Sequence, residues 1–187
     1  MPRSATRDEA TVTELRTVHT ADLDAGTRSA MRLLMDTVFT GFDDDKFENV
    51  LGGMHTLLLD DGELIGHASV VQRHILHGGR ALRTGYIEGV AVRADHRRQG
   101  HGATMMDVLE RIVRSAYELG ALGASPDGSR LYAARGWQLW QGPSSAMTPD
   151  GIRRTADTDG IIYVLPVSAP VDVSGELICD WRHGPLW

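Results

Sequence analysis

A basic, glycine-rich segment, Arg97-Arg-Gln-Gly-His-Gly102, is the part of the sequence whose residue types point most directly to binding chemistry. It follows an apolar stretch over 86–92, which predicts a buried strand, and it continues into an amphipathic stretch that predicts a helix. Glycine lets the backbone approach a ligand closely, and the first amides of a helix point outward without partners. Arg93 and the cations of the segment add positive charge to a chain that is acidic overall. This pattern favours a phosphate-binding site over an ordinary solvated run of charges.

The spacing of these residues decides which kind of phosphate site is expected. The sequence has no G-x-x-x-x-G-K-[ST] loop and no G-x-G-x-x-G with a downstream acid, which excludes the two commonest nucleotide-binding patterns. It has instead Arg97-x-x-Gly100-x-Gly102 after Val90-Ala-Val92, and Arg130-Leu-Tyr-Ala-Ala-Arg-Gly-Trp137 follows later. In this order and at this separation the two motifs resemble those of the GNAT superfamily of N-acetyltransferases.

Several stretches resemble one group within that superfamily, the aminoglycoside 2'-N-acetyltransferases, and the likeness extends from about His19 to Trp187. The resemblance implies an enzyme that transfers acetyl directly from acetyl-CoA to the 2'-amino group of aminoglycoside antibiotics, which is a resistance activity. It also implies an α+β fold, the GNAT fold, whose mostly antiparallel mixed sheet is flanked by helices and splayed near Glu88 and Gly89. The stretches are Leu51-Gly-Gly-Met-His55, Gly85 to Asp95, Arg130 to Trp137 and Cys179-Asp-Trp-Arg182.

Glu88 is the acid on which the implied chemistry depends. In a regular strand Glu88 would share a face with Val90 and Val92, but Gly89 permits a β-bulge that turns the carboxylate into a cleft. An aminoglycoside amine is mostly ammonium, whereas acetyl transfer needs the neutral amine. The resemblance therefore makes Glu88 the general base, acting through water, and a carboxylate also binds the cation that it neutralises. It makes Tyr132 the proton donor to the departing thiolate of coenzyme A.

The resemblance also assigns binding roles. The terminal carboxylate of Trp187 would bind substrate amines, and the backbone amides of Val90 and Val92 would hold the acyl and pantetheine carbonyls. The residues expected to bind acetyl-CoA are Val90, Ala91, Val92, Arg97, Arg98, Gln99, Gly100, His101, Gly102 and Ala103. The residues expected to bind the aminoglycoside are Asp43, Glu88, Gly89, Gly123, Asp159, Asp180 and Trp187.

Four positions depart from the pattern of the family. Pro185, Lys46 and Thr158 stand where the family carries acids, and Gly123 stands where it carries serine. These changes leave the half of the site that binds the acyl donor intact, and they bear on which antibiotics are accepted.

Composition narrows the classes of partner. The chain has 187 residues, of which 19 are Lys or Arg and 25 are Asp or Glu, for a net charge of −6. This balance argues against a nucleic-acid surface and fits a cationic ligand. No apolar run approaches the roughly 20 residues of a membrane span. The polar, acidic N-terminal residues do not resemble a signal peptide, so we expect a cytoplasmic protein with no membrane partner.

Cysteine and histidine give no indication of a metal site or a disulfide. Cys179 is the only cysteine, which excludes an intrachain disulfide, and we expect it to be a buried apolar residue. The eight histidines, His74-x-x-His77 included, form no metal-ligand pattern, so no metal is expected.

Periodicity and turn residues predict a flexible arm over 1–14 and a single domain over 15–187. Residues 142–160, rich in Pro, Asp, Thr and Gly, are expected to form a long loop that could act as a lid. Helices are expected over 25–40, with Asp22 or Asp24 as N-cap and Gly41 at the end, over 43–51, from Gly102 to Gly120, and over 128–135. Strands are expected over 15–20, 55–59, 64–76, 137–140 and 161–165, and Asp61-Gly62 is expected to form a hairpin turn. A further strand is expected to follow the turn at His77-Gly78-Gly79-Arg80 and to continue through Arg93.

Two alternatives stay open. The first is a GNAT enzyme that acetylates another cellular amine, such as a polyamine or a protein terminus, because the acidic positions are changed. The second is a non-catalytic module that binds acetyl-CoA or the drug, against which the presence of both Glu88 and Tyr132 argues. The resemblance implies a homodimer, for which the apolar C-terminal strand is the expected contact, although a monomer conflicts with nothing in the sequence.

Overall fold

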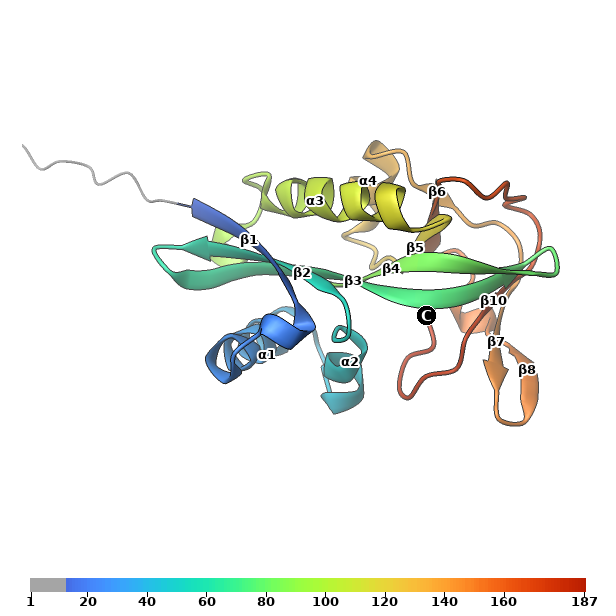
Figure 1. The fold of residues 1–187 in the computed structure, drawn as a ribbon, viewed down its shortest axis with the longest axis horizontal. Coiled ribbons are helices and arrows are strands. Elements are labelled where there is room, and N and C mark those ends of the chain that lie inside the picture. Colours follow the sequence, from blue (N-terminus) through green and yellow to red (C-terminus); the bar gives the residue numbers. More distant parts are fainter. Residues whose placement is uncertain (1–12) are drawn as a thin grey trace, which may run out of the picture.

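A ten-stranded mixed sheet lies between two layers of helices in the computed structural model, which describes residues 13–187 (Figure 1). Helices α3 and α4 cover one face of the sheet, and α1 and α2 lie against the other (Figure 1). The helices are α1 (Ala25–Val38), α2 (Asp44–Asn49), α3 (His101–Ala116) and α4 (Ser129–Ala134). The strands are β1 (Thr13–His19), β2 (Met54–Asp60), β3 (Glu63–His77), β4 (Arg80–Val92), β5 (Leu119–Gly123), β6 (Gln138–Leu139), β7 (Ser144–Thr148), β8 (Gly151–Arg154), β9 (Ile162–Pro166) and β10 (Leu177–Cys179).

The strand order is β6-β9-β5-β4-β3-β10-β7-β8, and most neighbouring pairs are antiparallel. Strand β3 is long enough to pair with β2 along its first half and with β10 near its end, and β1 extends the sheet beyond β2. Only β4 with β5 and β10 with β7 run parallel in the described chain. The predicted α+β architecture, with a mostly antiparallel mixed sheet, is confirmed.

Local signals in the sequence set most of the element boundaries. Asp24 is the N-cap of α1, where its carboxylate accepts from the amide of Thr27 at 2.7 Å, and Asp22 lies in a short 3-10 turn before it. Helix α1 ends at Val38, three residues before Gly41, because Phe39 is already extended. The Asp61-Gly62 pair forms the predicted hairpin turn, with φ of 47° and 83°.

Strand β5 is a correction to the prediction of one helix that continues to Gly120. Helix α3 ends at Ala116, and Leu119–Gly123 forms an inner strand parallel to β4. A Cβ on Gly120 would lie 3.0 Å from the side chain of Val113 and 3.1 Å from that of Trp137. Gly120 therefore allows close packing of α3 on the sheet and does not stop the helix.

The polar stretch 142–160 is also different from its prediction. Most of it forms the hairpin β7–β8, and β7 pairs with β10 inside the sheet. Ser144 and Ser145 are buried, and Ser144 Oγ bonds to Thr155, Thr158 and Asp159. Because buried hydroxyls supply these hydrogen bonds, a strand without apolar alternation is stable here. The predicted lid is thus largely part of the sheet.

Two further expectations concern the chain ends. Thr13 and Glu14, the last residues of the predicted arm, belong to β1 and pair with Asp60 and Leu59 of β2. The rest of the arm lies outside the described residues. The C-terminal strand β10 lies between β3 and β7, and the side chains of Leu177 and Cys179 are fully buried. Both edges of β10 are therefore paired within the sheet and are not available for pairing with a second copy, whereas the burial of Cys179 is confirmed. No described helix is both long and apolar enough to cross a membrane.

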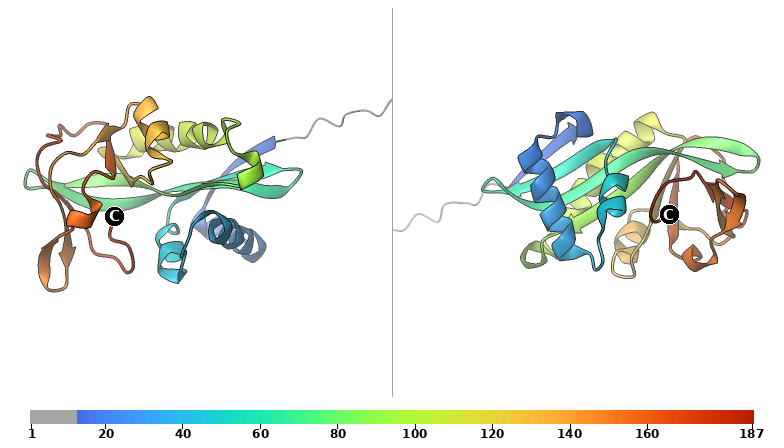
Figure 2. Two further views of the ribbon diagram at one scale, coloured as in Figure 1. Left: turned by 180° about the vertical axis from the view of Figure 1, so that it is seen from behind. Right: turned by 90° about the horizontal axis from the view of Figure 1, so that it is seen from below.

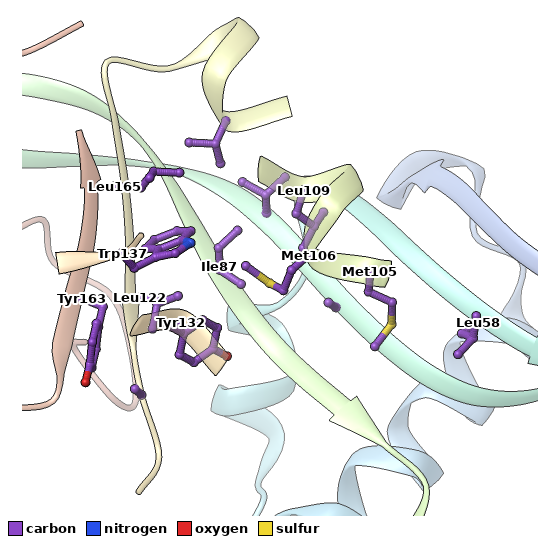
Figure 3. Packing of buried hydrophobic residues seen from close by; sticks show 14 of the residues in the cluster. Leu58, Ile87, Met105, Met106, Leu109, Leu122, Tyr132, Trp137, Tyr163 and Leu165 are labelled. Atoms are coloured by element: carbon purple, nitrogen blue, oxygen red, sulfur yellow. The ribbon is translucent and has the colours of Figure 1, made fainter. Parts of the chain in front are cut away.

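The apolar stripe of α3 anchors one face of the sheet. Met105, Met106 and Leu109 pack with Ile87 and with residues of α4 in one buried cluster (Figure 3). Polar bonds then fix α4 against α3. The carboxylate of Glu110 accepts from Arg135 Nε at 2.7 Å and from Trp137 Nε1 at 2.9 Å. This arrangement holds Tyr132, which lies on α4, in a defined place.

We expect Glu110→Ala to lower the free energy of unfolding by about 2–4 kcal/mol, because Arg135 and Trp137 would lose a buried acceptor. Urea denaturation measures this change. Asp107→Ala is the matched control, since Asp107 pairs with the same Arg135 but its side chain is 69% exposed. Equal losses in the two variants would contradict this role of Glu110.

Candidate active site

A β-bulge interrupts β4 at Gly89. In the β3–β4 register, Ser69 faces Glu88 and His67 faces Ala91, so one residue of β3 stands opposite two of β4. Gly89 has φ of 56°, and a Cβ there would lie 2.9 Å from Val50 Cγ1 and 3.3 Å from His67 Nδ1. Only glycine satisfies both the positive φ and the close contacts without strain. The predicted bulge is confirmed.

The sheet opens at the same place. Strands β4 and β5 pair only over Thr84–Tyr86 and Leu119–Ala121. Beyond Tyr86, β4 continues beside β3, whereas β5 continues beside β9. The two parallel strands therefore part immediately before Glu88, which is the splay expected from the sequence.

A cavity of about 310 Å³ lies at this opening. Its walls come from both faces of the sheet and from the C-terminal loop, which lies on the same face as α2 (Figure 2). The lining residues are Phe39, Thr40, Phe42, Lys46, Asn49, Val50, Ile87, Glu88, Gly89, Val90, Gly123, Ser125, Tyr132, Arg182, Pro185 and Trp187.

Glu88 is a buried acid with a cationic partner. Its side chain is only 17% exposed, and its carboxylate accepts from Nη1 of Arg182 in an ion pair. Burial raises the pKa of Glu88 above its ordinary value, while the guanidinium groups of Arg182 and Arg73 act in the opposite direction. The net effect is a raised pKa, which suits a carboxylate that must take up a proton near neutral pH.

Arg182 is the functional-site residue that sequence reasoning missed. It lies 94 positions from Glu88 along the chain, and only its place in the Cys179-Asp-Trp-Arg182 stretch pointed to it. Its Nε donates to the carbonyl of Pro185 at 2.6 Å, and its guanidinium lies 5.4 Å from the centre of the Tyr86 ring. These contacts hold the guanidinium in front of the carboxylate of Glu88.

Arg73 closes the loop that carries Arg182. Its Nε donates to Asp180 Oδ1 at 2.7 Å, and its Nη1 donates to the carbonyl of Leu186, also at 2.7 Å. The side chain of Arg73 is 4% exposed, so one buried guanidinium joins both ends of the loop 180–186. From α2, Asn49 Nδ2 donates to the carbonyl of His183 at 3.1 Å.

Three of the acids predicted to bind the acceptor do not line the cavity, and each has partners elsewhere in the structure. Asp180 accepts from Arg73 and from the amide of His74. Asp159 pairs with Arg154 and accepts from Ser144 Oγ, and Asp43 is the N-cap of α2. In this structure these three carboxylates therefore hold the local fold together and do not face the cavity.

The other predicted acceptor residues come together in the lining. Glu88, Gly89, Gly123 and Trp187 are all present there. A Cβ on Gly123 would lie 3.6 Å from the main-chain carboxylate carbon of Trp187, and Trp187 Nε1 donates to Thr155 Oγ1 at 3.0 Å. Among the changed positions, Lys46 and Pro185 line the cavity, whereas Thr158 bonds to Ser144 and Thr155 outside it.

Tyr132 enters the cavity from α4. Its ring is 6% exposed and lies 6.2 Å from the ring of Trp137, between centroids, in the cluster of Figure 3. Burial raises the pKa of Tyr132 to about 12. The hydroxyl therefore keeps its proton throughout the neutral range and can donate it.

The predicted phosphate-binding segment lies between the end of β4 and α3. Arg97, Arg98, Gln99 and Gly100 are exposed, and α3 begins at His101 with Gly100 as an N-cap that supplies no side-chain acceptor. Within residues 13–187, neither Arg97 nor Arg98 takes part in an ion pair, although Arg97 Nε donates to the carbonyl of Val92 at 3.0 Å. The exposed guanidinium groups and the helix start together fit an anion. No group of three or more possible metal ligands occurs in the described chain.

Comparison of the sequence with known proteins finds a family and a close relative. Residues 21–137 match the acetyltransferase (GNAT) family. The chain is 47% identical over 177 residues to an aminoglycoside 2'-N-acetyltransferase of Mycolicibacterium fortuitum, covering 92% of this chain and 91% of that protein.

Solved structures share the fold at low identity. The GNAT family N-acetyltransferase YhbS from Escherichia coli, in complex with CoA, matches with a TM-score of 0.64 and 16% identity over 93% of each chain. The ribosomal-protein-S18-alanine N-acetyltransferase from Escherichia coli matches with a TM-score of 0.58 and 17% identity, over 86% of this chain and 97% of that one. The predicted GNAT fold is confirmed.

We expect Gly89→Ala to lower the free energy of unfolding by about 1–3 kcal/mol more than Gly78→Ala, because only Gly89 has close neighbours. Gly78 is a matched control, since its φ of 57° equals that of Gly89 within a degree and a Cβ there would meet nothing within 4 Å. Chemical denaturation of both variants measures the difference. Equal losses would show that the bulge is not tightly packed.

Proposed function

This chain belongs to the acetyltransferase (GNAT) family, whose members use an acyl-CoA, and we propose that it transfers acetyl from acetyl-CoA to the 2'-amino group of aminoglycosides. The 47% identity to the Mycolicibacterium fortuitum enzyme, over nearly the whole of both chains, supports this acceptor. The observation that carries the proposal is the juxtaposition of Glu88 and Tyr132 in one cavity at the parting of β4 and β5.

The donor half of the site fits acetyl-CoA. When bound, acetyl-CoA supplies an acetyl group activated as a thioester. Val90, Ala91 and Val92 lie on β4 beyond the point where β5 leaves it, so their backbone would hold the acyl and pantetheine carbonyls. The residues that would hold the pyrophosphate and 3'-phosphate are Arg97, Arg98, Gln99, Gly100, His101, Gly102 and Ala103.

Glu88 and Tyr132 would handle the two protons. The carboxylate of Glu88 would take the proton of the acceptor ammonium, directly or through one water, and its raised pKa favours that transfer. Arg182 pairs with Oε1 of Glu88 in this structure, so an ammonium that contacts this oxygen would displace Arg182. The Tyr132 hydroxyl would give its proton to the departing sulfur, and the second proton that the acceptor nitrogen loses when the amide forms would restore it.

The charges of the lining support a second candidate acceptor. Among the described lining residues, Glu88 and the main-chain carboxylate of Trp187 supply two negative charges, and Lys46 and Arg182 supply two cations. The lining therefore carries no excess of acid for a polycationic aminoglycoside. This observation favours, as the alternative, an acceptor amine that carries fewer charges. Rates across a panel of aminoglycosides, polyamines and peptide N-termini separate the two candidates.

A homodimer stays a prediction from the resemblance. Since β10 pairs with β3 on one edge and with β7 on the other, a dimer cannot form by strand pairing at β10. Sedimentation of the purified protein tests this prediction.

We expect Glu88→Gln to lower turnover about 100-fold to 1,000-fold while acetyl-CoA still binds, because the amide of Gln cannot take up the proton of the acceptor amine. Release of coenzyme A with tobramycin as acceptor measures turnover, and mass spectrometry identifies the acetylated nitrogen. Glu48→Gln, an exposed position on α2, is the control. Full activity of Glu88→Gln would remove the base assignment. Wild-type protein that binds both ligands but releases no coenzyme A would favour the non-catalytic alternative.

We expect Arg182→Met to move the acidic limb of the pH profile of kcat/KM upward by about 1 unit. The reaction needs ionised Glu88, Arg182 lowers the pKa of Glu88, and burial then raises it unopposed except by Arg73. The rate at low pH is therefore lost first. Profiles of Arg182→Lys, which keeps the charge, and of Arg111→Met, an exposed position on α3, are the controls. An unmoved limb in Arg182→Met would contradict the electrostatic role of Arg182.

A further inference from the structure

Two fully buried histidines lie behind the bulge and have no part in the chemistry proposed above. His55 on β2 and His67 on β3 are 0% exposed. His67 Nδ1 lies 2.8 Å from the carbonyl oxygen of Gly89, and His67 Nε2 lies 2.9 Å from His55 Nδ1. His55 Nε2 in turn lies 2.7 Å from Thr20 Oγ1. A continuous chain of hydrogen bonds thus ends on the bulge residue next to Glu88.

The hydrogen bond to Gly89 determines the direction of this chain of hydrogen bonds, that is, which atom of each pair is the donor. A carbonyl oxygen only accepts, so His67 Nδ1 must carry the hydrogen that bonds to Gly89. In a neutral ring Nε2 of His67 is then an acceptor, so Nδ1 of His55 must donate to it. It follows that Nε2 of His55 is an acceptor as well.

The other end requires the same direction independently. Thr20 Oγ1 accepts from the amide of Gly52 at 2.8 Å and from that of Gly53 at 3.1 Å, which uses both of its lone pairs. The hydroxyl hydrogen of Thr20 is therefore free to point to His55 Nε2, which lies at 2.7 Å, whereas the other possible acceptor, the carbonyl oxygen of Gly53, lies at 3.1 Å. Both ends agree on two neutral rings, each with its hydrogen on Nδ1.

Protonation of either histidine ring to the charged form would break this chain of hydrogen bonds. A proton on His67 Nε2 would face the N–H of His55, and a proton on His55 Nε2 would face an oxygen whose lone pairs are in use. Burial lowers the pKa of His55 to about 4, with the charges of His19 and Arg28 acting in the same direction. Burial also lowers the pKa of His67 to about 3, against the raising effect of its bond to Gly89 and with a lowering effect of His55. Both rings are neutral across the physiological range.

The chain of hydrogen bonds from Thr20 to Gly89 joins two parts of the site. Gly52 and Gly53 follow α2, whose C-cap residue Val50 lines the cavity and lies against Gly89. The bulge itself carries Glu88 on one side and Val90 on the other. We propose that Thr20, His55 and His67 are positioning residues: their hydrogen bonds fix the Gly89 carbonyl and thereby the aim of the Glu88 carboxylate and of the Val90 amide. The kinetic consequence rests on the proposed acetyl transfer, whereas the hydrogen-bond direction does not.

The first test reads the direction of the chain in the wild-type protein. With ¹⁵N-labelled histidine, two rings are expected to show a protonated Nδ1 and a bare Nε2, unchanged from pH 8 to pH 5.5. This measurement requires neither activity nor a substitution, so its outcome is independent of the proposed function. Either ring protonated on Nε2, or titrating near pH 6.5, overturns the proposal.

The second test separates positioning from packing. His67→Asn keeps a donor nitrogen near the place of Nδ1, whereas His67→Leu keeps only the volume. We expect His67→Leu to lower kcat/KM at least about tenfold and to weaken acetyl-CoA binding in calorimetry, while His67→Asn recovers most of the loss. Equal losses in both variants, or no loss in His67→Leu, overturn the proposal. If the wild type proves inactive toward every amine tested, the calorimetric comparison still decides.

Discussion

The parting of β4 from β5 after Tyr86 is the constraint on which the site depends. Two parallel strands that stayed paired would fill the gap with their own hydrogen bonds and leave no opening in the sheet. The bulge at Gly89 changes the phase of β4 just beyond this point and turns Glu88 into the opening. Helices on both faces then close it, with α4 supplying Tyr132 and the end of α2 supplying the opposite wall. One interruption of the sheet thus creates both a place for a thioester and the acid beside it.

Two arginines, Arg182 and Arg73, stabilise the charge of the carboxylate that the backbone turns into the opening. A carboxylate as buried as that of Glu88 is costly to ionise, and the loop 180–186 supplies the compensating guanidinium of Arg182. Arg73 fixes that loop by bonds to Asp180 and Leu186. An acceptor ammonium carries the same charge as Arg182, so the two compete for one place. The site is therefore organised for a cation before the acceptor arrives.

Sequence reasoning reached what local chemistry determines. The N-cap expected at Asp22 or Asp24, the Asp61-Gly62 hairpin and the bulge at Gly89 each follow from one residue type and its neighbours, and the structure confirms them, with Asp24 as the cap. Strand β5 was not predicted because the glycine at 120 reads locally as a helix stop, whereas its reason is the packing of Val113 and Trp137. Hairpin β7–β8 was not predicted because buried hydroxyl bonds replace apolar alternation there. Arg182 meets Glu88 only through tertiary structure, which no local pattern encodes.

We infer that one opening in the sheet holds both the acyl donor and the proton acceptor for the amine. A crystal structure of the ternary complex with coenzyme A and tobramycin tests this inference. We expect the pantetheine arm to lie between β4 and β5 and the 2'-nitrogen to lie within one water of the Glu88 carboxylate, with Arg182 moved aside. Coenzyme A bound elsewhere, or a 2'-nitrogen remote from Glu88 while Arg182 keeps its ion pair, would contradict it.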